Sequence, residues 1–204
     1  MLFNPLKLKT LKRLQADKEA FNSALFIGGY IKSCFRVTKG NTILILQRKY
    51  YNSSVRKMVI VSACLLGINT KYNGNSNINE EVIALKDKFI LIPVCPEQLG
   101  GLTTPRIPAE MQKNGSVYNK KGGDVTENFL RGANETLKLA KLFNIKYALL
   151  KDGSPSCGVH SIYDGTFSGK KIRSKGVTAR LLMNNGIKVF SENDIKEFIN
   201  ETEK

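Results

Sequence analysis

Three cysteines of this chain stand where short apolar, β-type runs end. Cys64 closes the run MVIVSAC, Cys95 closes FILIPVC, and Cys157 ends the stretch YALLKDGSPSC. If these runs are neighbouring parallel strands, the three thiols meet at the carboxyl edge of one sheet, where open α/β sheets bind their ligands. Three thiolates can hold a soft metal centre and leave one position open for a substrate. The placement therefore predicts chemistry at this edge.

The type and number of these ligands narrow the choice of metal. The spacing is Cys64-x30-Cys95-x61-Cys157, without a C-x-x-C pair, so the pattern matches neither a zinc ribbon nor a thioredoxin motif. Thiolate-only ligation favours zinc or an iron–sulfur cluster over magnesium or calcium. Iron–sulfur clusters usually take four protein thiolates, so a cluster with three keeps one exchangeable iron site. Three small buried thiols without a metal are the plainer alternative.

Two charged residues follow Cys95 in a loop rich in Gly, Pro and Thr. Glu97 lies two residues beyond the cysteine, and near a metal it could act as a general base toward water. Arg106, further along the loop, could contact an anionic or carbonyl-bearing substrate. A solvated loop carboxylate and a surface arginine are the alternatives for these two residues.

Two hydroxyl groups lie beside Cys157. Ser154 and Ser156 flank Pro155 in a turn that can direct hydroxyls and backbone N–H groups toward a ligand. Either serine could relay a proton or hold a substrate oxygen, but the sequence has no Ser-His-Asp pattern that would make one a nucleophile. His160 is the only histidine of the chain, and we expect a structural or supporting role for it.

The segment after Cys64 contains an Asn-Gly turn, Lys71-Tyr72-Asn73-Gly74. Tyr72 or Asn73 could line the pocket, with a purely conformational role in the turn as the alternative. The sequence has neither a P-loop nor a GxGxxG motif, so nucleotide binding through those motifs is unsupported.

Strand-like and helical patterns alternate from Met58 onward. The predicted strands cover residues 58–63, 89–94, 146–150 and 187–190, and the predicted helices cover 78–88, 124–143, 177–185 and 192–202. Asn77 is a possible cap of the first helix, and Gly186 is a typical terminator of the third. Two glycine-rich loops, 96–123 and 152–176, separate them. Four β-then-α units indicate an α/β fold with a parallel or mostly parallel sheet covered by helices.

Residues 1–57 differ from the remainder of the chain. They carry 12 Lys or Arg and 2 Asp or Glu, which is +10 of the formal net charge of +15. The pattern predicts one basic helix over 7–30 and one strand over 41–51, without the alternation that builds a core. The segment could be sequence upstream of the true start, an organellar targeting peptide or an accessory segment. Cys34 lies in it and receives no role, and residues 58–204 are predicted to form a single α/β domain.

The charge distribution and the cysteine content bear on partners and compartment. Residues 58–204 carry only +5, whereas nucleic-acid binders gather charge on the folded face that makes contact, so a nucleic-acid partner is disfavoured against a small anionic or polar substrate. Four cysteines are too sparse for a secreted disulfide scaffold, and no secretory signal opens the chain. We expect a reducing, cytoplasmic location, or an organellar one if residues 1–57 are a transit peptide. No apolar run approaches the ~20 residues that span a bilayer.

Several of these segments together resemble one protein family. They are VSACLLG, KYNG, PVCPEQLGGLTTPR, SPSCG, YDGTFSG, GVTARLL and NNGIKVFSE. The resemblance is to domain-of-unknown-function family 523, which includes the iron–sulfur-dependent thiouracil desulfidases. It runs from Met58 to about Glu192 and covers none of residues 1–57.

The resemblance implies a Rossmann-like α/β fold with a [4Fe–4S] cluster held by Cys64, Cys95 and Cys157. It implies that the iron without a protein ligand binds the thiocarbonyl sulfur of a thiolated pyrimidine. Water activated by a glutamate, here Glu97, would attack the ring carbon, and the sulfur would leave on the cluster. The substrate class is a thiolated pyrimidine or a related thio-base or nucleoside.

Other details of the resemblance concern the serines and a possible fourth ligand. Ser154 and Ser156 both match the SPSC motif and are carried over together as catalytic candidates. Many relatives have a further cysteine where this chain has Thr70, so a fourth ligand from that turn is missing, which agrees with three-cysteine ligation. Two other functions stay open: a non-catalytic zinc or iron–sulfur module that binds RNA through the basic segment, and a thiol redox protein.

Overall fold

The computed structural model describes residues 24–27, 30–34, 36–37, 43–44 and 56–203. The chain divides into two compact units, Met1–Ser53 and Ser54–Lys204. In the first unit β1 (Ala24–Ile27) pairs antiparallel with β2 (Tyr30–Cys34), and β3 (Arg36–Val37) pairs antiparallel with β4 (Ile43–Leu44).

The prediction of a helix over 7–30 is wrong at β1 and at the first residue of β2, and the remainder of that range lies outside the described residues. The sequence has a Gly-Gly pair directly after β1, and glycine disfavours a continuing helix. The strand predicted over 41–51 is described only at β4.

The second unit is built on a parallel sheet of four strands. These are β5 (Met58–Ser62), β6 (Ile90–Val94), β9 (Tyr147–Leu150) and β12 (Lys188–Ser191), in the order β12-β9-β5-β6. All four predicted strands are confirmed, each within one residue at either end. The chain winds from β5 to β6 in one direction and then to β9 on the other side of β5. The boundary between β5 and β9 is therefore a topological switch point, where open α/β sheets bind ligands.

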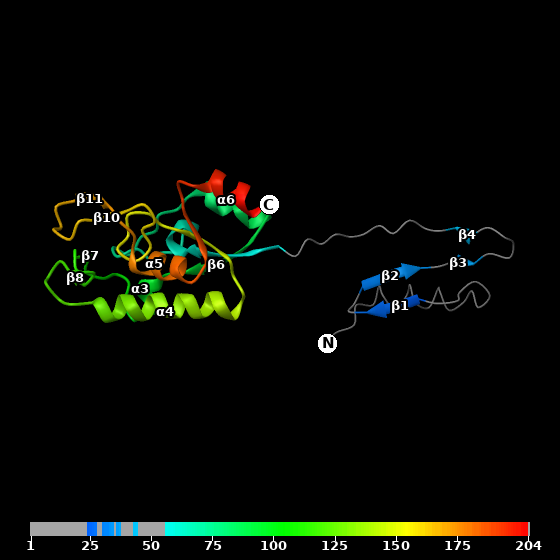
Figure 1. Ribbon diagram of the computed structural model, residues 1–204, viewed down its shortest axis with the longest axis horizontal. Coiled ribbons are helices and arrows are strands. Elements are labelled where there is room, and N and C mark those ends of the chain that lie inside the picture. Colours follow the sequence, from blue (N-terminus) through cyan, green and yellow to red (C-terminus); the bar gives the residue numbers. More distant parts are fainter. Residues whose placement is uncertain (1–23, 28–29, 35, 38–42, 45–55, 204) are drawn as a thin grey trace. The chain divides into compact units, whose positions relative to one another are not determined.

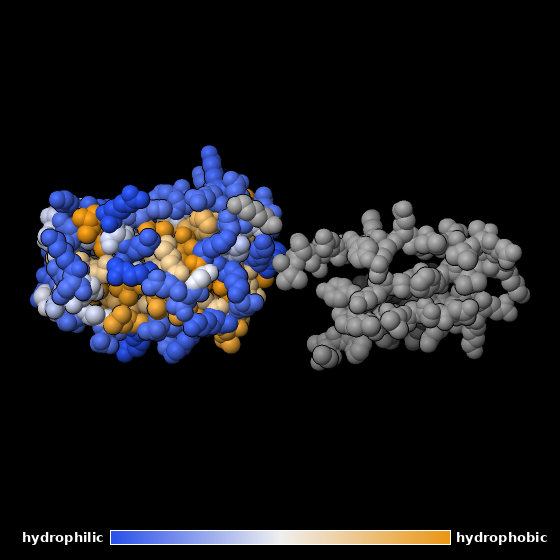
Figure 2. Space-filling model, in the orientation of Figure 1, coloured by the Kyte–Doolittle hydropathy of each residue, from blue (hydrophilic) through white to orange (hydrophobic). Residues whose placement is uncertain are grey.

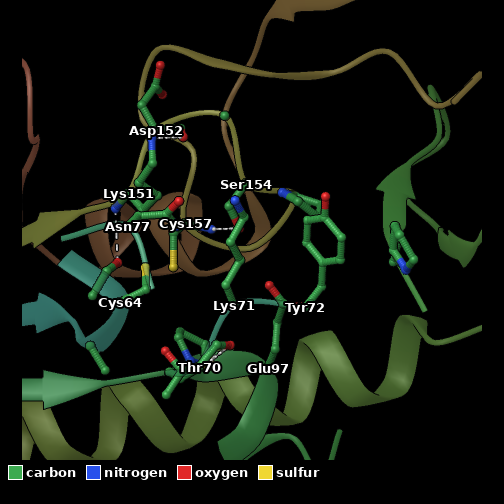
Figure 3. A pocket seen from close by; sticks show the side chains of 18 of the residues that line it. Cys64, Thr70, Lys71, Tyr72, Asn77, Glu97, Lys151, Asp152, Ser154 and Cys157 are labelled. Atoms are coloured by element: carbon green, nitrogen blue, oxygen red, sulfur yellow. Dashed lines mark hydrogen bonds between the residues drawn. The ribbon is translucent and has the colours of Figure 1, made fainter. Parts of the chain in front are cut away.

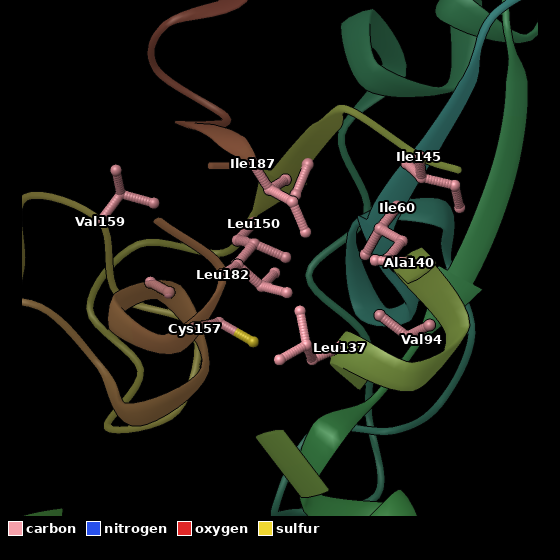
Figure 4. Packing of buried hydrophobic residues seen from close by; sticks show 12 residues of the cluster. Ile60, Val94, Leu137, Ala140, Ile145, Leu150, Cys157, Val159, Leu182 and Ile187 are labelled. Carbon is pink, nitrogen blue, oxygen red and sulfur yellow. The ribbon is translucent and has the colours of Figure 1, made fainter. Parts of the chain in front are cut away.

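Helices cover both faces of this sheet (Figure 1). One face holds α4 (Thr126–Leu142) and α5 (Val177–Asn184), and the other holds α2 (Glu80–Ala84) and α6 (Ile195–Thr202). Within β5 the side chains alternate: Ile60 packs toward α4 and α5 (Figure 4), whereas Val59 and Val61 pack toward α2 and α6. A strand buried on both faces reads as a continuous apolar run, which is why the sequence revealed these strands.

The first predicted helix differs from the observed one. It consists of α2 followed by a 3₁₀ turn, η2 (Leu85–Asp87), and it is capped by Asn79 instead of Asn77. The Asn79 side chain accepts the N–H of Val82 at 3.1 Å, as an N-cap does. Asn77 donates its backbone N–H to the carbonyl of Cys64 instead. The predicted terminator is confirmed, because Gly186 has a φ of +77° and donates its N–H to Met183.

The two predicted loops contain short regular elements that the sequence did not reveal. The first holds α3 (Pro96–Leu99), β7 (Ala109–Met111) and β8 (Val117–Asn119), and the second holds β10 (Ser161–Tyr163) and β11 (Lys171–Arg173). Strands of three residues are too short to show a two-residue period. Their apolar residues form a small separate cluster with Phe129 of α4.

The surface of the second unit is mostly polar. In Figure 2 charged and polar side chains surround a central apolar area on the face that is seen. No helix in the described part of the chain is long and apolar enough to cross a membrane.

Helix α3, which directly follows Cys95, lies unusually close to α4. A Cβ added at Gly132 of α4 would stand 1.8 Å from the carbonyl oxygen of Pro96 and 3.1 Å from the N of Gly100. Only glycine permits this approach. The position of α3, and of the residues it carries, therefore depends on a small residue in the middle of α4.

We expect Gly132→Ala to lower the free energy of unfolding by about 1–3 kcal/mol, because the added methyl group must push α3 away. In a helix without a close neighbour, the same Gly→Ala change would raise the free energy of unfolding by roughly 1 kcal/mol. The sign of the measured change therefore distinguishes close packing from an open helix. Urea unfolding followed by circular dichroism measures it, with Asn134→Ala on the exposed side of α4 as the control. A Gly132→Ala variant as stable as the wild type would contradict the close packing.

Candidate active site

A cavity of about 330 Å³ lies at the carboxyl edge of the sheet beside the switch point. Its volume is within the range of about 300–1,000 Å³ that is common for small-molecule sites. Lining residues come from both predicted loops and from the turn after β5. Among them are seven of the residues predicted from the sequence: Cys64, Tyr72, Cys95, Glu97, Arg106, Ser154 and Cys157. Figure 3 labels all of these but Cys95 and Arg106.

The three cysteines reach this cavity from three strands. Cys64 lies in the 3₁₀ turn η1 (Ala63–Leu66), which follows β5 at once, and Cys95 occupies the N-cap position of α3 directly after β6. The register pairs Ser62 with Val94, so β5 and β6 end side by side. Cys157 follows β9 after a tight turn. Figure 3 shows the sulfur atoms of Cys64 and Cys157 pointing into the same cavity.

Burial and mutual proximity disfavour the thiolate forms of two of these cysteines. Burial raises the pKa of the Cys157 thiol, and the nearby Cys64, Cys95 and Glu97 raise it further, against a hydrogen bond from Ser62. Burial also raises the pKa of Cys64, and Cys95 adds to this effect. A cationic centre between the sulfur atoms would offset both effects. The donor set, three soft ligands that face one cavity, fits an iron–sulfur cluster.

Glu97 is held in the cavity wall by Arg106. The Nε of Arg106 donates to Oε2 of Glu97 at 2.7 Å, and the two side chains are 7% and 16% exposed. The guanidinium also donates to the carbonyl of Thr70 at 3.0 Å, to the hydroxyl of Thr104 at 3.0 Å and to the carbonyl of Thr103 at 3.3 Å. Arg106 lines the cavity, but its nitrogen atoms are all engaged with the protein. These contacts hold Glu97 and the loop in place, so Arg106 has a positioning role.

The structure separates the two candidate serines. Ser154 lines the cavity, and its Oγ accepts the N–H groups of Ser156 and Cys157, both at 3.1 Å. Among the described residues no acceptor binds its hydroxyl proton, so this proton is available to a ligand in the cavity. Ser156 is 1% exposed and shares a 2.8 Å hydrogen bond with the hydroxyl of Thr178 on α5. Ser156 belongs to the interface between the turn and α5, and it does not line the cavity.

The remaining predicted residues divide between the cavity and the surface. Tyr72 lies at the cavity rim with the Nζ of Lys71 5.7 Å from its ring centroid. Asn73 does not line the cavity, and its side chain accepts the N–H of Asn75 within the turn. His160 is exposed, and its Nε2 lies 2.6 Å from a carboxylate oxygen of Asp194. These contacts agree with the structural roles considered for Asn73 and His160.

Several polar residues of the cavity wall were not predicted from the sequence, among them Glu110, Lys151, Asp152, Tyr163 and Lys171. Lys151 and Asp152 follow β9 directly, so the carboxyl-edge rule that selected the cysteines could have found them. Glu110, Tyr163 and Lys171 belong to the short strands β7, β10 and β11, which are too short to show a strand pattern in the sequence.

Asp152 organises the turn that carries Cys157. Its Oδ1 accepts the N–H groups of Val159, His160 and Ser161, and its Oδ2 accepts the hydroxyl of Ser161. Burial alone would raise the pKa of Asp152, but these hydrogen bonds outweigh it and lower the pKa from 3.8 to about 2. The charged carboxylate is therefore part of the folded turn.

Asp152→Asn is expected to reduce the free energy of unfolding by about 1–2 kcal/mol at neutral pH, since amide oxygens accept more weakly than carboxylates. Because the pKa of Asp152 is lower in the folded state than in the unfolded state, its carboxylate stabilises the fold at pH values above 3.8. This stabilisation is lost as the pH falls through about 2. The gap between variant and wild type should thus close toward pH 2. Urea titrations of the full chain with reduced thiols test this, with the exposed Asp87→Asn as the control. A gap that does not change between pH 5 and 2 would count against this role.

Fold and site together define a class of protein. It is a doubly wound α/β protein whose pocket at the switch point is lined by three cysteines and a partly buried glutamate that is paired with an arginine. A family model described as 2-thiouracil desulfurase matches residues 59–194, and the chain belongs to this family. The match confirms the resemblance stated from the sequence and its extent.

Two known proteins are similar to the chain. The "[4Fe-4S]-dependent thiouracil desulfidase TudS" is a solved structure that is 43% identical, with a TM-score of 0.69 over 72% of this chain and 98% of that chain. The "Uncharacterized protein YbbK" of Bacillus subtilis (strain 168) is 43% identical over 151 residues, which is 70% of this chain and all of that protein. The structural match agrees with the Rossmann-like α/β fold expected for residues 58–204.

Proposed function

We propose that this protein hydrolyses the carbon–sulfur bond of a thiolated base, such as thiouracil, and releases sulfide. One observation carries the proposal: three cysteines, Glu97 and Ser154 line one cavity in a chain of the 2-thiouracil desulfurase family. The similar solved protein is named as a [4Fe-4S]-dependent thiouracil desulfidase.

Cys64, Cys95 and Cys157 would hold a [4Fe–4S] cluster. Three thiolates are a soft ligand set that a [4Fe–4S] cluster accepts, with one iron left without a protein ligand. When bound, the cluster supplies an iron with an open coordination position, which is a Lewis acid toward the substrate sulfur.

The protein's own residues would activate water. Oε2 of Glu97 is engaged by Arg106, and Oε1 accepts a proton from a water molecule in the cavity. The water oxygen forms a bond to the ring carbon while the carbon–sulfur bond breaks. The carbon becomes a carbonyl, and the sulfur leaves as hydrosulfide with the remaining proton. Ser154 donates its hydroxyl hydrogen bond to the substrate, and Arg106 positions Glu97.

Anaerobic reconstitution of the full chain tests this function. We expect about four iron and four acid-labile sulfide per chain, and stoichiometric release of sulfide and uracil from 2-thiouracil or 4-thiouracil. Zinc-loaded protein serves as the control and should be inactive. A protein that binds the cluster yet releases no sulfide from any thiolated base would overturn the catalytic function and leave a binding module.

The two serines are expected to respond differently to substitution by alanine. Ser154→Ala should lower kcat/KM by about 10–100-fold, because it removes the only hydroxyl that this turn directs into the cavity. Ser156→Ala should leave kcat/KM within about twofold and reduce stability by about 1–2 kcal/mol, because Thr178 loses its buried partner. Steady-state kinetics and thermal unfolding of both variants check the pair. The opposite assignment would place the active hydroxyl on Ser156.

A further inference from the structure

The cavity contains a second carboxylate that the proposed reaction does not use. Glu110 lies in β7 and lines the cavity, although the residue is only 7% exposed. Its Oε2 accepts two backbone N–H groups of the loop between β10 and β11, from Gly165 at 2.9 Å and from Phe167 at 3.0 Å. These two hydrogen bonds fix the carboxylate in one orientation.

The other oxygen, Oε1, has no hydrogen-bond partner among the described residues, and Glu110 forms no ion pair there. No buried side-chain nitrogen or oxygen in the described part of the chain is both unpaired and sealed from solvent. Oε1 therefore keeps some access to solvent, and Glu110 is one of the residues that line the cavity. A carboxylate oxygen that is mostly removed from water requires a hydrogen-bond donor.

Among the described residues, none of the four cationic side chains of the cavity wall is hydrogen-bonded to Glu110, and the Nζ of Lys71 lies 5.7 Å from the ring centroid of Tyr72. Arg106 is paired with Glu97, and Lys151 is paired with Glu192 and with the carbonyl of Asp152. The Nζ of Lys171 lies 5.4 Å from the ring centroid of Tyr163. Oε1 of Glu110 is therefore available to a donor on a ligand in the cavity.

The loop on the far side of Glu110 is held in a fixed conformation. Phe167 has a φ of +58°, which a bulky L-residue rarely adopts. Its N–H is one of the two that Glu110 binds. A carboxylate oriented by a strained loop is a preorganised acceptor, which binds a donor at one defined position.

We propose that Oε1 of Glu110 accepts the ring N–H next to the thiocarbonyl group, so that the substrate must be a thiolactam with a free N–H. This inference rests on the proposed function and adds the requirement on the substrate. A thiolactam N–H is a stronger donor than an ordinary amide N–H, and a charged acceptor strengthens the hydrogen bond further. A methyl group on that nitrogen removes the donor and leaves a buried carboxylate oxygen unpaired. Sites built to bind a donor reject such analogues strongly.

The first experiment compares two substrates on wild-type holoenzyme: 4-thiouracil and its N3-methyl derivative. We expect kcat/KM to be at least about 100-fold lower for the methylated compound. Equal rates for the two substrates would overturn the proposal, and this result does not depend on any variant being folded.

The second experiment uses Glu110→Gln. The glutamine carbonyl can still accept both backbone N–H groups, but its NH₂ group now faces the cavity as a donor. We expect the preference for the N–H substrate to fall at least about tenfold, with the iron content unchanged. The affinity for uracil, measured by calorimetry, should fall in parallel. An unchanged preference in Glu110→Gln would assign Glu110 to loop structure alone.

The proposed function and this inference can fail separately. If reconstituted wild type releases no sulfide from any thiolated base, the proposed function fails. Calorimetry with uracil and N3-methyluracil then still tests the role of Glu110. The proposal predicts that uracil binds and that N3-methyluracil binds about 100-fold more weakly. Equal affinity for both would refute the role of Glu110 by itself.

Discussion

Glu97→Gln is expected to lower kcat/KM for release of sulfide by about 10²–10⁴-fold, the range typical of a lost general base. Glutamine has the size of glutamate, and its carbonyl can still accept the Nε–H of Arg106. It cannot take a proton from water at neutral pH. The variant should therefore fold, keep its iron and bind substrate, while the chemical step fails.

Steady-state kinetics, iron content and the melting temperature of Glu97→Gln test this expectation. Glu127→Gln, which removes an exposed carboxylate from the first turn of α4, is the matched control and should behave as the wild type. If Glu97→Gln retains wild-type kcat/KM, Glu97 is not the base. A loss that tracks the loss of iron would show that Glu97 serves the metal site instead.

Serine at any one of the three cavity cysteines is expected to reduce activity more than about 10³-fold and to lower the bound iron. A serine oxygen is a harder and less acidic ligand than a cysteine sulfur, so each variant leaves one iron weakly held. Cys157→Ser should be the most severe, because Cys157 also packs within the apolar cluster that includes Leu137 and Leu182 (Figure 4).

Iron and sulfide analysis after anaerobic reconstitution measures this effect. Cys34→Ser is the control, since the sequence assigns Cys34 no role. A thiol redox protein needs only two cysteines. If the protein worked in this way, one of the three cavity substitutions would leave the activity unchanged. Three equivalent losses of iron with a silent Cys34→Ser would exclude the redox alternative, whereas a loss at Cys34 would contradict three-cysteine ligation.

The sequence by itself determined the sheet and the positions of the cysteines. Strands buried on both faces appear as continuous apolar runs, and parallel strands joined by helices end at one edge. Cys64 and Cys95 follow their strands within two residues, so their convergence required only local pattern and topology. Glu97, two residues beyond Cys95, reaches the cavity for the same reason.

Only the tertiary structure decided what each polar side chain does at that edge. Ser154 and Ser156 are equivalent in the SPSC motif, but Thr178, 22 residues away from Ser156, draws Ser156 out of the cavity. The sequence suggested Arg106 as a substrate ligand, but in the structure its guanidinium donates to the Glu97 carboxylate and to the Thr70 carbonyl.

No local sequence pattern marked Glu110 as a site residue, because the orientation of its side chain depends on backbone N–H groups more than 50 residues further along the chain. Strand ends are set by neighbouring residues, whereas the directions of side chains in turns and hairpins are set by partners distant in sequence. The three thiols could therefore be read from the amino-acid order, and the acid–base and specificity groups around them could not.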